Sequence, residues 1–87
     1  MVQVQAVNEA KKAVSYMQIA IQLMEKCIEK KGWSCYCEDE FRDFAYWLSV
    51  EMHEYFRPCD TCNEISWEAV QRGLEKLKKC VDEVLAN

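Results

Sequence analysis

Six cysteines stand in a chain of 87 residues whose composition is otherwise that of a helical protein. Only two glycines and one proline are present and 51% of the residues are hydrophobic, which excludes a disordered or collagen-like chain. So short a chain buries one small core, and the free energy gained by that burial barely exceeds the conformational entropy lost on folding. Covalent cross-links are therefore expected to contribute a large share of the free energy of unfolding. The six residues are Cys27, Cys35, Cys37, Cys59, Cys62 and Cys80.

Apolar residues recur at helical spacing in three segments, and no segment shows the pattern of a strand. We expect helices at about residues 4–31, 38–56 and 67–86. Gly32 is a typical helix stop, Pro58 disfavours continuation of the second helix, and Ser66 is a good amino-terminal cap. Because the connections are short, consecutive helices must run antiparallel. The sequence therefore predicts an all-α fold, a small antiparallel three-helix bundle cross-linked by disulfides, with residues 1–87 as a single domain.

Each predicted helix has an apolar face that we expect to point into the core. In the first helix this face is a heptad pattern of Val7, Val14, Ile21 and Ile28 with Ala10, Met17 and Met24. In the second it comprises Phe41, Phe44, Ala45, Leu48, Met52, Tyr55 and Phe56. In the third it comprises Trp67, Val70, Leu74, Leu77, Val81 and Val84. Trp33 follows the first helix and is expected to fold back on Ile28.

The predicted topology brings four cysteines to one end of the bundle. These four are Cys27, Cys35, Cys37 and Cys80. We expect Cys27 and Cys80 each to form a disulfide with Cys35 or Cys37, which would tie both outer helices to the first connection. The alternative is a closed tetrahedral site in which four thiolates bind a metal ion. The Cys-x-Cys spacing disfavours that alternative, so we expect neither metal nor cofactor.

Cys59 and Cys62 are expected at the opposite end of the bundle. A shared zinc site with Cys35 and Cys37 is disfavoured, because a helix of about 19 residues would hold the two pairs roughly 28 Å apart. Cys59 and Cys62 are therefore expected to close a local link. The alternative is a redox pair whose thiolate is stabilised by the amino end of the third helix.

The net charge of −4 argues against nucleic acid as a partner, because binding to phosphates depends on positive charge. No apolar run is long enough to cross a membrane, and no secretory signal is visible at the amino terminus. The expected location is therefore cytoplasmic, or secreted if a signal peptide has been removed. Disulfides in a cytoplasmic protein favour a thermophilic source.

A second set of apolar residues lies outside the heptad pattern, where a lone bundle offers them little to pack on. This set comprises Tyr16, Ile19 and Leu23 in the first helix and Tyr46, Trp47 and Val50 in the second. Exposed apolar surface with Tyr and Trp is typical of protein interfaces. We expect a protein partner or, most simply, a homodimer. Partial burial within a skewed bundle is the alternative.

No arrangement of residues indicates catalysis. His53 is the single histidine, and it lies beside Glu54 and opposite no obvious nucleophile. The sequence therefore predicts a non-enzymatic protein that acts through protein–protein interaction, in a regulatory or structural role. The first alternative is a metal-binding or thiol-redox protein that uses the four-cysteine cluster or the Cys59-x-x-Cys62 pair. A second alternative is a carrier of a lipid or small ligand in a cavity between the first two helices.

Overall fold

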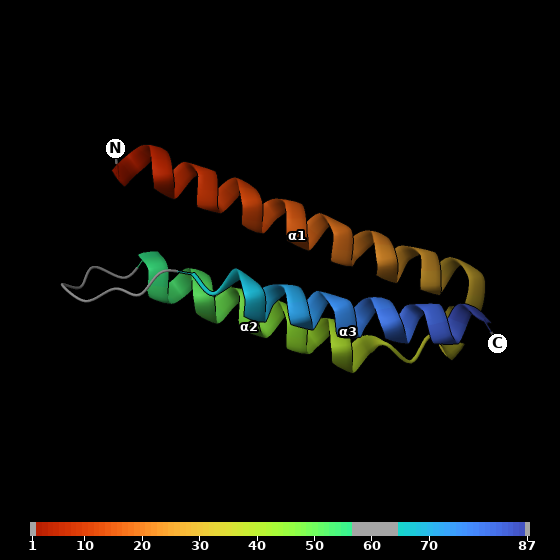
Figure 1. The fold of residues 1–87 in the computed structure, drawn as a ribbon. Coiled ribbons are helices and arrows are strands. Elements are labelled where there is room, and N and C mark those ends of the chain that lie inside the picture. Colours follow the sequence, from red (N-terminus) through yellow and green to blue (C-terminus); the bar gives the residue numbers. More distant parts are fainter. Residues whose placement is uncertain (1, 57–64, 87) are drawn as a thin grey trace.

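The computed structural model describes residues 2–56 and 65–86, which form three helices and one short turn (Figure 1). The elements are α1 (Val2–Lys31), a 3-10 turn η1 (Gly32–Ser34), α2 (Glu38–Phe56) and α3 (Trp67–Ala86). In Figure 1 the chain runs along α1, returns along α2 and reverses again along α3, whose carboxyl end lies near the turn between α1 and α2. The predicted antiparallel three-helix bundle is confirmed, and the helix bounds agree within two residues.

Local signals in the sequence explain where the helices begin and end. Gly32 has a φ of +54°, a left-handed conformation that glycine adopts without steric cost, and this ends α1 as predicted. Three acidic residues in the first turn of α2 stabilise the start of that helix, because negative charges interact favourably with its positive amino-terminal end. The carbonyl of Ser66 accepts the backbone N–H of Val70 (3.3 Å), and the carboxylate of Glu51 accepts the N–H of Ser66 (3.1 Å).

The core faces of α2 and α3 agree with the predicted periodicity. Phe44 and Leu48 of α2 are buried, as are Val70, Leu77 and Val81 of α3. The remaining predicted core residues that the structure describes are partly buried at the margin of the core, namely Phe41, Ala45, Met52, Tyr55, Trp67, Leu74 and Val84. Within the described ranges, none of the helices combines the length and apolar character that a membrane crossing requires.

The predicted core line of α1 is wrong for its branched residues. Val7, Val14, Ile21 and Ile28 are 51%, 56%, 42% and 54% exposed. A second heptad of the same helix points into the core instead, and its members are Ala13, Ala20 and Cys27. Met17 and Met24, which lie between the two lines, are partly buried. The helix is therefore rotated about its own axis relative to the predicted orientation.

Contacts with Trp67 of α3 explain part of this rotation. The rings of Tyr16 and Trp67 are stacked, with centroids 5.4 Å apart and planes 11° apart. The indole Nε1–H of Trp67 donates to the carboxylate of Glu9 (2.6 Å), and Lys12 Nζ lies 4.7 Å from the ring centroid. Together these contacts turn the Glu9 and Tyr16 side of α1 toward α3. The branched residues then lie on the flank.

Residue size favours the same orientation. Ala13 and Ala20 carry small side chains at the line of closest approach, so α1 can pack closely on the other two helices. Trp33 does not cover Ile28 as predicted, because its side chain is fully exposed. One flank of α1 and the turn that follows it therefore present apolar side chains to solvent.

Candidate functional site

Two disulfides join the three helices at one end of the bundle, which we call the tip. Cys27 of α1 is bonded to Cys35 in the first connection, with Cα atoms 5.7 Å apart. Cys37, just before α2, is bonded to Cys80 of α3, with Cα atoms 5.8 Å apart. Both bonds agree with the predicted pairing of Cys27 and Cys80 with the first connection. Cys59 and Cys62 lie outside the described residues.

The sulfurs of the tip form one cluster. The Sγ atoms of Cys27, Cys35 and Cys37 all lie within 4.8 Å of one another, and the disulfide places Cys80 beside Cys37. Cys27 and Cys37 are fully buried, whereas Cys35 and Cys80 are partly buried. Four sulfurs from three parts of the chain therefore meet in a site with limited access to solvent.

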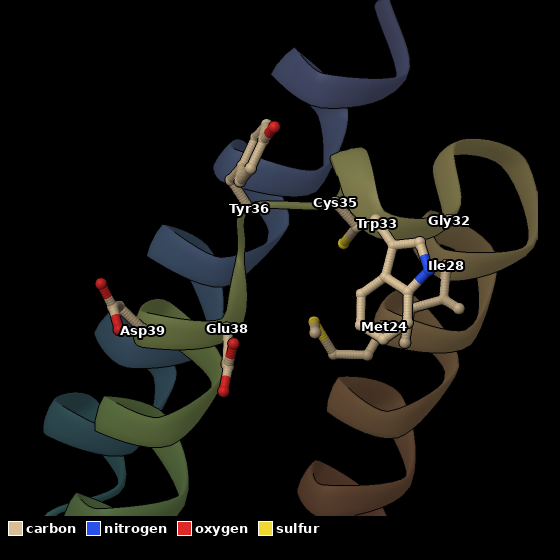
Figure 2. Close-up of a pocket in the computed structure, with 8 residues that line it drawn as sticks. All are labelled: Met24, Ile28, Gly32, Trp33, Cys35, Tyr36, Glu38 and Asp39. Atoms are coloured by element: carbon tan, nitrogen blue, oxygen red, sulfur yellow. The ribbon is translucent and has the colours of Figure 1, made fainter.

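A pocket of about 740 Å³ lies between the end of α1 and the start of α2 (Figure 2). In Figure 2, Met24, Ile28 and Trp33 lie on the α1 side of this tip pocket, and Glu38 and Asp39 lie on α2 across from them. Gly32, Cys35 and Tyr36 complete its lining. The pocket is thus apolar on one wall and acidic on the other.

The tip pocket continues into the exposed flank of α1. We call this flank the α1 stripe and define it by its exposed residues Val4, Val7, Val14, Ile21 and Ile28. Ile28 belongs both to the α1 stripe and to the pocket lining. One apolar surface therefore extends from the first turn of α1 to Trp33. The sequence signal for this surface is the Val/Ile heptad, which the periodicity assigns to the core.

The predicted interface residues differ in their exposure to solvent. Tyr16 and Leu23 pack against the core, so the prediction that they lie on the outer side of α1 is wrong. Ile19 is 46% exposed, and Val50 is partly buried. Tyr46 and Trp47 are exposed on α2 and contact each other edge to face, with ring centroids 5.4 Å apart. Partial burial, the alternative to an interface, is thus correct for Tyr16 and Leu23.

The histidine of α2 and two of its carboxylates lie on the surface. His53 is exposed near the end of α2, and Asp39 and Asp43 are exposed near its start. Glu51 accepts the backbone hydrogen bond from Ser66, which gives this carboxylate a structural role. That the protein is not an enzyme stays a prediction.

Comparisons of this chain with protein-family models, with curated proteins and with solved structures give no match. The proposals about its function therefore rest on its own residues.

The two tip disulfides should contribute unequally to stability. Cys37–Cys80 joins residues 43 apart in sequence and Cys27–Cys35 joins residues 8 apart, so the former removes more entropy from the unfolded chain. Chain entropy alone predicts that Cys37→Ala/Cys80→Ala lowers the free energy of unfolding by about 4 kcal/mol, and Cys27→Ala/Cys35→Ala by about 2.5 kcal/mol.

The two variants are matched, because each removes one fully buried and one partly buried cysteine. Urea unfolding monitored by circular dichroism gives both free energies. An equal or reversed order would show that native packing around the sulfurs, and not loop length, sets the contribution of each bond.

Proposed function

We propose that this protein is a non-enzymatic interaction protein, a disulfide-stabilised helical bundle that associates with a second copy of itself through the α1 stripe. The observation that carries this proposal is the exposure of Val7, Val14, Ile21 and Ile28, which are all between 42% and 56% exposed. Branched apolar residues with a strict seven-residue period are typical of helices that pack along a partner helix. In this chain, α2 and α3 pack on a different face of α1.

Energetic considerations favour a partner for this surface. Fully burying a Val or Ile side chain stabilises by roughly 1.5–3 kcal/mol, and about half of that is still available at each position of the α1 stripe. Two copies together could gain on the order of 10 kcal/mol, which is comparable with the roughly 4–15 kcal/mol that association costs. The α1 stripe alone therefore supports weak pairing. Contacts on either side of the stripe then set the dissociation constant of the dimer.

The disulfides support the proposal by fixing the orientation of α1. Cys27 is fully buried, and its bond to Cys35 holds the last turn of α1 against the first connection. A helix that is held in this orientation cannot rotate to bury its Val/Ile line in the core of its own chain. Two disulfides also favour an oxidising compartment, or the cytoplasm of a thermophile, as the place where the protein acts.

Placing a charge in the α1 stripe should abolish self-association. Ile21→Asp puts a carboxylate where the second copy would bury an isoleucine, and burying an unpaired charge opposes association strongly. We expect the unmodified chain to sediment as a dimer at tens of micromolar and the variant to sediment as a monomer with unchanged helicity.

Ile19→Asp is the matched control, because Ile19 has a similar exposure but lies on another flank of α1. The control should remain dimeric. An unmodified chain that is monomeric at all concentrations, or a control that dissociates while Ile21→Asp does not, would contradict the proposal.

A second candidate function is favoured by the sulfur cluster at the tip. Reduction of both disulfides by a dithiol reductant transfers two electrons and two protons to each bond and yields four thiols. Four thiolates around one zinc ion lie about 3.8 Å apart, given a Zn–S distance of about 2.3 Å and tetrahedral geometry. The limit of 4.8 Å between Cys27, Cys35 and Cys37 is compatible with that arrangement after small side-chain movements.

This candidate predicts that the reduced chain, and not the oxidised chain, binds one zinc ion. Titration of the reduced chain with Co²⁺ as a spectroscopic probe, followed by displacement with Zn²⁺, measures the stoichiometry. Cys80→Ser should abolish tight binding, and Cys59→Ser/Cys62→Ser should retain it. Equal binding by the reduced chain and by Cys80→Ser would exclude a four-cysteine site.

A further inference from the structure

The α1 stripe has a direction, because its two ends differ. Valines occupy the amino-terminal half at positions 4, 7 and 14, and the larger Ile21 and Ile28 occupy the carboxyl-terminal half. The tip pocket with the fully exposed Trp33 adjoins only the carboxyl-terminal end. A partner that matches this surface must therefore present apolar side chains both along the stripe and at the pocket.

We infer that two copies pair through antiparallel α1 helices, with the amino-terminal turn of each copy in the tip pocket of the other. This inference rests on the self-association proposed above and adds its geometry. The twofold axis would lie near Gln18, so that Val7 and Val14 of one copy lie beside Ile28 and Ile21 of the second copy.

Side-chain size favours the antiparallel arrangement. It places a valine against an isoleucine at each level, so the spacing between the two helices stays uniform along the seam. Parallel helices would place Val7 beside Val7 and Ile28 beside Ile28, and the seam would be wide at one end and loose at the other. Uniform packing without voids is the more stable arrangement.

Charges along the α1 stripe favour the same arrangement. Lys11, Gln18 and Glu25 are exposed, follow the stripe on its solvent side and are spaced seven residues apart. About a twofold axis near Gln18, Lys11 of each copy faces Glu25 of the other, and the two Gln18 side chains face each other. A shift of one heptad would set Lys11 or Glu25 against Gln18 and lose both charge pairs.

These two charged side chains are available for such pairing. In the part of the chain that the structure describes, the ion pairs join Arg42 to Glu38 and Arg72 to Glu68. Parallel helices would place Lys11 and Glu25 on opposite sides of the seam from their counterparts. Charge complementarity thus selects the orientation as well as the register.

The tip pocket completes the match. In this register Val4 of one copy lies level with Gly32 of the second copy, beside the apolar wall formed by Met24, Ile28 and Trp33 (Figure 2). The first turn of α1 contains no acidic residue, so no carboxylate of that turn interacts with the positive end of the helix. Glu38, whose carboxylate is ion-paired with Arg42, and Asp39 line the opposite wall and would lie near that helix end.

Disulfide trapping at the axis tests the orientation. Gln18→Cys in the full chain should form a covalent dimer under mild oxidation about a hundredfold faster than Ile19→Cys, because two thiols near a twofold axis have a millimolar effective concentration. Ile19→Cys is the matched control, since Ile19 is also exposed on α1 but lies on another flank of the helix. Trapping rates are measured on non-reducing gels at the chain concentration where the native protein is dimeric.

The outcomes separate this inference from the proposed function. A native chain that dimerises through the α1 stripe but traps no faster with Gln18→Cys than with Ile19→Cys would overturn the antiparallel geometry alone. A monomeric native chain would overturn both.

Because Lys11 and Glu25 face each other across the seam, Lys11→Glu should weaken the dimer about tenfold, and Lys11→Glu/Glu25→Lys should restore it. A double variant no tighter than the single one would also overturn the register.

Substitution of Trp33 tests the contact in the tip pocket separately from the rest of the seam. Trp33 is fully exposed, so Trp33→Ala leaves the packing of the single chain unchanged but should raise the dissociation constant of the dimer about tenfold. Binding of a small apolar probe such as anilinonaphthalene sulfonate to the pocket should fall as the chain dimerises. An unchanged dissociation constant together with undiminished probe binding in the dimer would show that the pocket holds a small ligand, and would overturn its assignment to the partner's amino-terminal turn.

Discussion

The buried Cys27 and its bond to Cys35 constrain the rest of the structure, because they determine which face of α1 looks inward. Cys27 is completely buried in the core and bonded to a residue of the first connection, so the last turn of α1 cannot rotate freely. Fourteen residues earlier, Ala13 lies on the same line, and the stacked rings of Tyr16 and Trp67 hold that end of the helix. Two attachments at different levels fix the rotation of a rigid helix.

This orientation leaves an apolar surface that the bundle itself does not cover. The Val/Ile line could be buried only by turning α1, which would expose Cys27 and separate Tyr16 from Trp67. The tip disulfides therefore have two effects: they cross-link a small core, and they hold an apolar face of α1 toward solvent. The tip pocket extends that face past the end of the helix, so both features belong to one surface.

Much of the fold could be predicted from the sequence, because its signals are local. Gly32, Ser66 and the helical periodicity mark the helix ends, and the antiparallel topology brings the four tip cysteines together. The core face of α1 could not be predicted from its pattern alone, since the helix carries two overlapping heptads. The Val/Ile heptad is the more hydrophobic, but the heptad of Ala13, Ala20 and Cys27 contains the cross-linked cysteine. The second attachment of α1, the contact of Tyr16 with Trp67 51 residues away, is tertiary and leaves no local signal in the sequence of the helix.

Methyl nuclear Overhauser effects, recorded on a mixture of isotope-labelled and unlabelled chains, test the orientation of α1 most directly. The structure predicts that Ala13 and Ala20 methyl groups contact core side chains such as Phe44 and Leu77 within one chain. Val14 and Ile21 methyl groups should show no contacts to these core side chains and, in the dimer proposed above, should show contacts between chains. Intramolecular contacts from Val14 or Ile21 to the Phe44 ring would contradict the account, because they would place the Val/Ile line in the core.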